Sequence, residues 1–144
     1  MKKMTYLLLK FTFILSVLCT IAVPFSGRFI NKYYHYSNLQ LCLFIFIITL
    51  SGVFSVFLLY SLKSLYRTFA NNNPFVSDNI KFLNYIAFCC GGITMCYIIK
   101  CIFIFTPAAF MVMLMFGMST LLAISLRDLF KKAVEYKEEN DLTI

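Results

Sequence analysis

Six cysteines and one histidine are the residues of this chain with the clearest potential for chemistry. A metal site needs several convergent Cys, His or acidic ligands, and a thiol oxidoreductase needs a paired, activated thiol. Here every cysteine lies within an apolar run, no two form a Cys-x-x-Cys pair, and His35 stands far away in a predicted loop. We therefore expect no metal site and no cofactor, and interpret the cysteines as small packing residues. They are Cys19, Cys42, Cys89, Cys90, Cys96 and Cys101.

The same apolar runs lack the groups that acid–base catalysis requires. They contain no acidic residue and no histidine, so a Ser or Thr nucleophile there would have no activating base. Lys100 is the single charge between residues 82 and 126. A lysine inside a span is a functional candidate by default. Because Lys100 lies near the predicted outer end of its helix, we expect its side chain to snorkel to the headgroups instead. We expect no enzymatic activity.

The composition indicates an integral membrane protein. The chain has 144 residues, of which 61% are hydrophobic and 13% charged. A soluble globule of this size needs more polar surface, whereas helices surrounded by lipid do not. The net charge of +7 fits topology signals and contacts with the lipid bilayer. We therefore expect no direct nucleic-acid binding.

The charge-free runs predict four transmembrane helices, near residues 11–30, 39–68, 78–105 and 107–136. One helix over residues 82–126 would reach about 68 Å, against a hydrocarbon core of about 30 Å. Thr106-Pro107 is the turn that we expect to divide it, because proline suits the first position of a helix. A signal peptide is the alternative for the first run, but no small-x-small cleavage site follows it. The fold class is all-α, one domain over residues 1–144, with the helices as two antiparallel hairpins.

Two polar segments leave the spans, a connector at residues 63–83 and a tail at residues 127–144. Asn73-Pro74 should stop the second helix, and Ser77 with Asp78 should begin the third. We expect the tail to extend the fourth helix, with an Asp128–Lys132 ion pair and a break at Asn140-Asp141.

The distribution of basic residues predicts which side each segment occupies. Ten lie at the amino end, in the connector and in the tail, and three lie on the opposite side. Cytoplasmic segments carry the excess of Lys and Arg, so both termini, the connector and the tail should be cytoplasmic. The ten are Lys2, Lys3, Lys10, Lys63, Arg67, Lys81, Arg127, Lys131, Lys132 and Lys137; the three are Arg28, Lys32 and Lys100.

Small residues on the spans, such as Ser51, Gly52 and Ser55, predict close helix packing. Whether they pack within the chain or between chains stays open, and with it a homo-oligomer. We also expect the connector and the tail to form one cytoplasmic surface, with Phe75 covering Leu129 or Phe130. The candidate partner-contact residues on it are Asn73, Pro74, Phe75, Asn79, Glu138, Glu139, Asn140, Asp141, Leu142 and Ile144.

Two motifs resemble a known family. Asn73-Pro74-Phe75, followed by Asn79 and Leu83, resembles the central loop of a small bacterial four-span family, domain of unknown function 2975. The tail at residues 138–144 resembles the carboxyl end of that family, so that the resemblance covers essentially the whole chain. The family has no established enzymatic activity or cofactor. Its members are often encoded beside a small helix-turn-helix regulator of the Cro/CI type, which implies by analogy a regulatory role at the membrane.

Together these observations predict a small, non-enzymatic, multi-pass protein of the bacterial cytoplasmic (inner) membrane. We expect it to sense or tether, as the membrane-side partner of a cytoplasmic regulator protein. The alternative is an accessory subunit of a transport, export or immunity system, which would pack on its partners through the small residues of the spans.

Overall fold

The computed structural model describes residues 2–27, 29, 32, 37–70 and 77–142. Within these residues every regular element is helical, which confirms the predicted fold class. The elements are α1 (Lys2–Ala22), the 3-10 turn η1 (Val23–Ser26), α3 (Asn38–Ala70), α4 (Ser77–Phe103) and α5 (Pro107–Leu142).

Four of these helices are long and apolar enough to cross a membrane: Met4–Ser26, Asn38–Phe69, Ser77–Phe103 and Pro107–Asn140. Large apolar side chains are exposed along all four, as expected where lipid rather than water covers a surface. The protein is therefore a multi-pass membrane protein, as the composition predicts.

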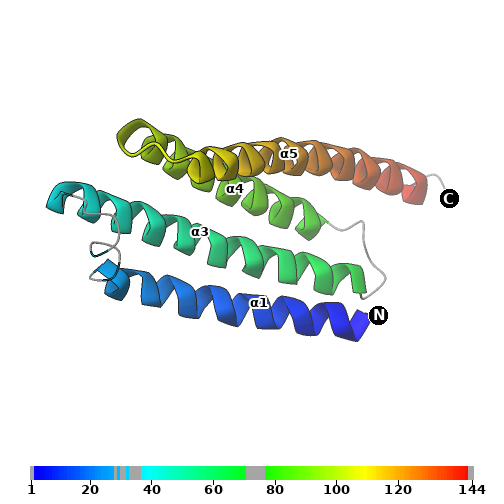
Figure 1. The fold of residues 1–144 in the computed structure, drawn as a ribbon. Helices are drawn as coiled ribbons and strands as arrows, with labels where there is room; N and C mark the ends of the chain where they lie inside the picture. Colours follow the sequence, from blue (N-terminus) through cyan, green and yellow to red (C-terminus); the bar gives the residue numbers. More distant parts are fainter. Residues whose placement is uncertain (1, 28, 30–31, 33–36, 71–76, 143–144) are drawn as a thin grey trace.

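Neighbouring helices follow the order of the chain. The helix α1 packs on α3, α3 on α4, and α4 on α5. Consecutive helices alternate in direction, so the chain's two ends, the end of α3 and the start of α4 all lie at one end of the molecule (Figure 1). This end, which we call the polar end, carries the connector and the tail.

The first helix differs from its prediction at both ends. It begins at Lys2 rather than near residue 11, and regular α-helix stops at Ala22 rather than near residue 30. Charge marks where a span leaves the hydrocarbon, but a helix can continue through it, so Lys10 lies well inside α1. At the other end Pro24 supplies no backbone N–H, and the chain tightens into the turn η1.

The predicted turn at Thr106-Pro107 is confirmed. Helix α4 ends at Phe103 and α5 starts at Pro107. The amide of Ile104 still donates to the carbonyl of Lys100 (2.7 Å), and the amide of Phe110 donates to the carbonyl of Thr106 (3.2 Å). One helix therefore finishes and the next begins within three residues.

Glycines lie at the contacts between neighbouring helices. A Cβ atom built on Gly91 of α4 would lie 3.7 Å from the methyl of Thr120, and one on Gly117 of α5 would lie 3.8 Å from the methyl of Thr94. Each glycine thus faces a threonine of the other helix. On α3, a Cβ on Gly52 would meet Thr20 Oγ1 of α1 at 2.8 Å. Gly52, Gly91 and Gly117 therefore each contact another helix of the same chain.

Candidate partner-binding surface

The predicted contact residues belong to the polar end, but the structure describes only some of them. Asn73, Pro74, Phe75 and Ile144 lie outside the described residues. The others lie on two helices: Asn79 in the first turn of α4, and residues 138–142 in the last turns of α5. The geometry of these two helices therefore defines the surface.

A fixed register joins α4 to α5. Arg127 Nη1 of α5 donates a hydrogen bond to Asn84 Oδ1 of α4 (3.2 Å). The hydrogen bond pairs residue 84 with residue 127, and the two glycine–threonine contacts pair 91 with 120 and 94 with 117. From 91 to 84 the chain moves seven residues towards the start of α4, and from 120 to 127 it moves seven residues towards the end of α5. All three pairs therefore fit one antiparallel register. The same register puts Ser77 level with Val134. Residues 135–142 then project about 12 Å beyond the start of α4.

An aromatic contact joins α3 to the same part of α5. The rings of Phe69 and Phe130 meet edge to face, with centroids 5.7 Å apart. Such a pair contributes about 0.5–1.5 kcal/mol beyond the apolar area it buries. From the sequence we expected Phe75 to cover Leu129 or Phe130. Phe75 lies outside the described residues, and the side chain of Leu129 is 63% exposed. Phe69, at the end of α3, thus holds the base of the α5 projection.

Asn79 is not on the surface in this structure. Its side chain is completely buried, and it begins a buried stripe along α4 that continues through Leu83, Ala87 and Cys90. These positions recur at intervals of three and four residues, which is the period of one helix face. We therefore interpret Asn79 as a residue that positions the start of α4, not as one that touches a partner.

The end of α5 is an exposed part of the polar end. Glu138, Glu139 and Asn140 are exposed, and Asp141 and Leu142 are the last two helical residues. The predicted break at Asn140-Asp141 is wrong, because the helix continues through both. The preceding run of Lys and Glu residues favours helix, and Asn and Asp disfavour it by only a few tenths to about 0.7 kcal/mol each.

Two ion pairs lie near this surface, and one differs from its prediction. The carboxylate of Asp128 accepts from Arg127 Nη2 at 2.9 Å, not from Lys132 as the i,i+4 spacing predicted. Arg127 is already directed along the helix surface by Asn84, which brings its guanidinium within reach of the adjacent carboxylate. In the first turn of α4, Lys81 Nζ lies 3.0 Å from Asp78 Oδ1. Both pairs are largely exposed and contribute little to stability.

Lys100 does not extend to the headgroups as the sequence predicted. It is only 8% exposed, and its Nζ lies 4.8 Å from the centre of the Phe44 ring and 5.6 Å from that of Tyr97. Aromatic faces attract an ammonium group that has lost water, so the two rings offset part of the cost of its burial. This places Lys100 in a packing role between α3 and α4.

The interior offers hydroxyl groups but no charged cluster within the described residues. A cavity of about 310 Å³ between the helices is lined by residues that include Ser16, Thr20, Ser51 and Tyr97. Thr20 and Ser51 donate their hydroxyl hydrogens to backbone carbonyls of their own helices, at 2.8 and 2.9 Å. No group of three His, Cys, Asp or Glu side chains converges there as metal ligands.

The six cysteines are all free thiols. Cys89, Cys90 and Cys96 are buried in α4, while Cys19 and Cys42 are exposed on the apolar surface. They therefore occupy packing and lipid-facing positions.

Sequence reasoning missed Asn84 and Phe69 as residues of this surface. Asn84 could have been recognised in the sequence, because it is a polar amide inside an apolar run and Arg127 is the first charged residue after Lys100. Phe69 has none, because its partner is decided by how α3 and α5 pack.

One family model matches residues 28–144, and it is described as a protein of unknown function (DUF2975). The match includes α3, α4 and α5 with the connector and the tail, and it leaves out α1, although the resemblance read from the motifs extended over the whole chain. The chain matches no curated protein and no solved structure.

Proposed function

The chain belongs to the DUF2975 family, and we propose that it is a non-enzymatic membrane protein that binds a cytoplasmic regulatory protein at its polar end. One observation carries the proposal. The helix α5 projects past the start of α4 as an exposed, charged helix end on a molecule whose spans are otherwise apolar. Residues Asn84 and Phe69 hold the base of this projection against α4 and α3.

The charges of the polar end support a cytoplasmic orientation. Ten of the thirteen basic residues of the chain belong to segments of this end, and such an excess favours the cytoplasmic side of a bacterial inner membrane. The six acidic residues belong to the same end. Almost all groups able to meet a charged partner would then face the cytoplasm.

The end of α5 has the chemistry to select a basic partner. Glu138, Glu139 and Asp141 lie in its last turns, where the negative end of the helix dipole disfavours acidic side chains. A cationic partner surface would relieve this repulsion, and charge complementarity would set partner choice more than affinity. A small helix-turn-helix regulator, the class of partner that the family resemblance implies, would offer such a surface, because proteins that bind DNA carry basic patches.

The proposal is tested with the full-length protein in membranes. A photoreactive amino acid at Tyr136, which is 68% exposed, should cross-link one discrete cytoplasmic protein. Glu138→Lys should reduce that cross-link, whereas Lys137→Glu, the opposite change at the adjacent exposed position, should preserve or increase it. Deleting residues 140–144 should abolish both the cross-link and any regulatory output while leaving insertion intact. A truncated protein that keeps the cross-link and full output would refute the proposal.

No described feature favours the alternative of a transport, export or immunity subunit. That alternative relied on small residues offered to other chains, and Gly52, Gly91 and Gly117 instead face threonines of the same chain.

A further inference from the structure

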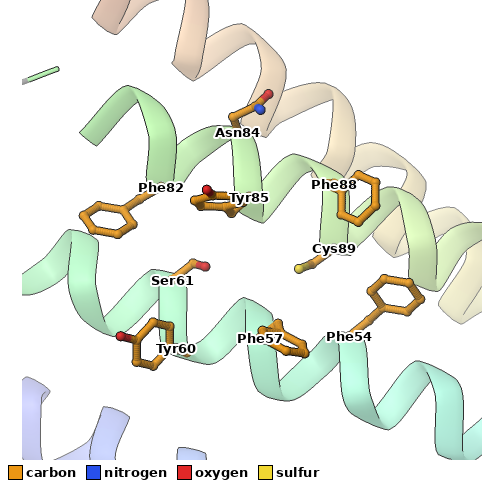
Figure 2. A pocket seen from close by; sticks show the side chains of 9 residues that line it. All are labelled: Phe54, Phe57, Tyr60, Ser61, Phe82, Asn84, Tyr85, Phe88 and Cys89. Atoms are coloured by element: carbon orange, nitrogen blue, oxygen red, sulfur yellow. The ribbon is translucent and has the colours of Figure 1, made fainter. Parts of the chain in front are cut away.

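A groove of about 620 Å³ runs between α3 and α4, on the part of the spans nearest the polar end. Figure 2 shows its walls, with aromatic rings from both helices, and its floor, formed by Ser61 and Cys89. These two floor residues are about 95% buried, whereas four of the wall rings are 56–71% exposed, so the groove opens to the outside of the protein. The wall residues are Phe54, Phe57 and Tyr60 of α3, and Phe82, Tyr85 and Phe88 of α4.

The rings form two matching rows. On each helix three aromatic residues follow one another at intervals of three, from residue 54 to 60 and from residue 82 to 88. This interval keeps side chains on one side of a helix. Because α3 and α4 pack side by side, the two rows become the facing walls of one channel about 10 Å long.

The walls suit a lipid chain better than another helix. Transmembrane helices approach one another through small residues, and here large rings would hold a second helix away from the floor. A flexible hydrocarbon chain can lie between the rings and contact both rows. Both walls belong to segments that could span the membrane, so acyl chains are the molecules that surround the opening.

Polar and cationic groups stand at the end of the groove nearer the polar end. Asn84 belongs to the lining and accepts a hydrogen bond from Arg127 Nη1. Lys81, beside the wall residue Phe82, has a side chain that is 68% exposed and forms an ion pair with Asp78, as Arg127 does with Asp128. Such exposed pairs are weak, so a phosphate, which a guanidinium fork and an ammonium group bind strongly, can replace the carboxylates as the partner of these two cations. The groove thus has an apolar channel that can hold an acyl chain and, at one end, groups that can bind a phosphate. A phospholipid carries both parts.

We propose that this groove is a phospholipid site, with one acyl chain between the two rows of rings and the phosphate beside Arg127 and Lys81. This inference rests on the membrane location of the chain and does not depend on the proposed regulatory partner. At the inner end of the groove the rings of Phe54 and Phe88 meet edge to face, with centroids 6.2 Å apart, so the lipid would fill the space from this contact towards the polar end.

Mass spectrometry of the intact full-length protein, released from mild detergent, tests the site directly. The wild type should retain one phospholipid, identified by its added mass. Ser61→Phe puts a ring on the groove floor and should lower retention by about tenfold. Ser119→Phe makes the same change at an exposed position of α5, outside the groove, and should retain the lipid. Equal retention by both variants, or an added mass of a fatty acid without phosphate, would overturn the proposal.

A second measurement uses only the wild type and stands even if Ser61→Phe does not fold. The protein is reconstituted with a phospholipid that carries a photoreactive group in its acyl chain. Cross-links should concentrate on residues 54–61 and 82–89. An even distribution over all four helices would mean ordinary surrounding lipid, and protein–protein cross-links at these residues would mean that a second copy occupies the groove. Either result contradicts the proposal.

Discussion

Helices α1 and α4 are both apolar enough to span a membrane, yet the protein uses them differently. None of the most apolar part of α1 is buried inside the protein, compared with 33% of that of α4. Helix α4 lies between α3 and α5, whereas α1 packs closely only on α3 among the described long helices. Apolarity therefore predicts that a helix spans the membrane but not which helices lie beside it, because lipid is as apolar as a protein core.

Small residues make the difference between the two helices. Gly91 of α4 faces α5, and the adjacent Gly92 faces the ring of Phe54 on α3. Two neighbouring glycines therefore serve two different contacts, and α4 can pack closely on both sides. Helix α1 has no glycine within Lys2–Ala22 and offers Thr20 to Gly52 of α3 instead.

The family match separates the same two regions. It begins at residue 28 and so includes α4 but not α1. We interpret α3, α4 and α5 as the structural unit of the family in this chain, and α1 as a helix attached to one side of it.

The largest effect should follow a large side chain at the α4–α5 contact. Gly91→Leu overfills the space in front of Thr120 and should lower the free energy of unfolding by about 1–3 kcal/mol. Thermal unfolding of the solubilised protein, followed by circular dichroism, measures this. Gly91→Ala is the control, since its Cβ fits at 3.7 Å and alanine favours helix. An unchanged melting temperature for Gly91→Leu would show that α4 and α5 are not packed as described.

A smaller effect should follow the equivalent change at the α1–α3 contact. Gly52→Leu collides with Thr20 and should release α1 while α3, α4 and α5 remain folded. Lys63 Nζ lies 5.7 Å from the ring of Tyr6, so these two long side chains meet across the contact. In a protein without its native cysteines, a flexible bifunctional maleimide that joins Tyr6→Cys to Lys63→Cys reports the contact, and this cross-link should be lost. If Gly52→Leu instead lowers the melting temperature as much as Gly91→Leu, α1 is part of the core and the comparison fails.

A weaker effect is expected where α5 leaves α4. Asn84→Ala removes the acceptor of Arg127 Nη1 and should cost about 0.5 kcal/mol, because the hydrogen bond is exposed. Hydrogen exchange should become faster in α5 beyond residue 127 and stay unchanged in its apolar part. Asn84→Asp keeps an acceptor and adds a charge, so exchange should stay slow. Equal exchange in all three proteins would remove this contact from the account.

The smallest effect should come from the cysteines. Replacing all six with alanine removes only small apolar groups and should leave membrane insertion and helix content unchanged, as measured by fractionation and circular dichroism. A wild-type fold that is lost on reduction and restored by oxidant would contradict this expectation.

The sequence predicts the spans well because lipid imposes a simple length requirement. The apolar run after Phe82, whose single charge is Lys100, is too long for one crossing, and the sequence places the return at Pro107. It predicts the ends of helices less well. Lys10 and the Asn140-Asp141 pair mark changes in polarity, and helix continues through both because backbone hydrogen bonding does not stop at the membrane surface.

Side-chain partners could not be predicted, because they depend on the rotation of one helix against another. Asn79 has the polarity of a surface residue, but the helix turns it inward. The two rows of rings could have been found, since their three-residue spacing is visible in the sequence; only their facing position required the structure.

The central claim is that the projecting end of α5 lies in the cytoplasm, and the cysteine-free protein allows a direct test. Single cysteines are introduced at Glu138, on the projection, and at Phe105, in the turn at the opposite end of α5. Intact cells are treated with a maleimide that cannot cross membranes. The account predicts labelling of Phe105→Cys in intact cells, and labelling of Glu138→Cys only after the membrane is opened. Labelling of Glu138→Cys in intact cells would contradict it.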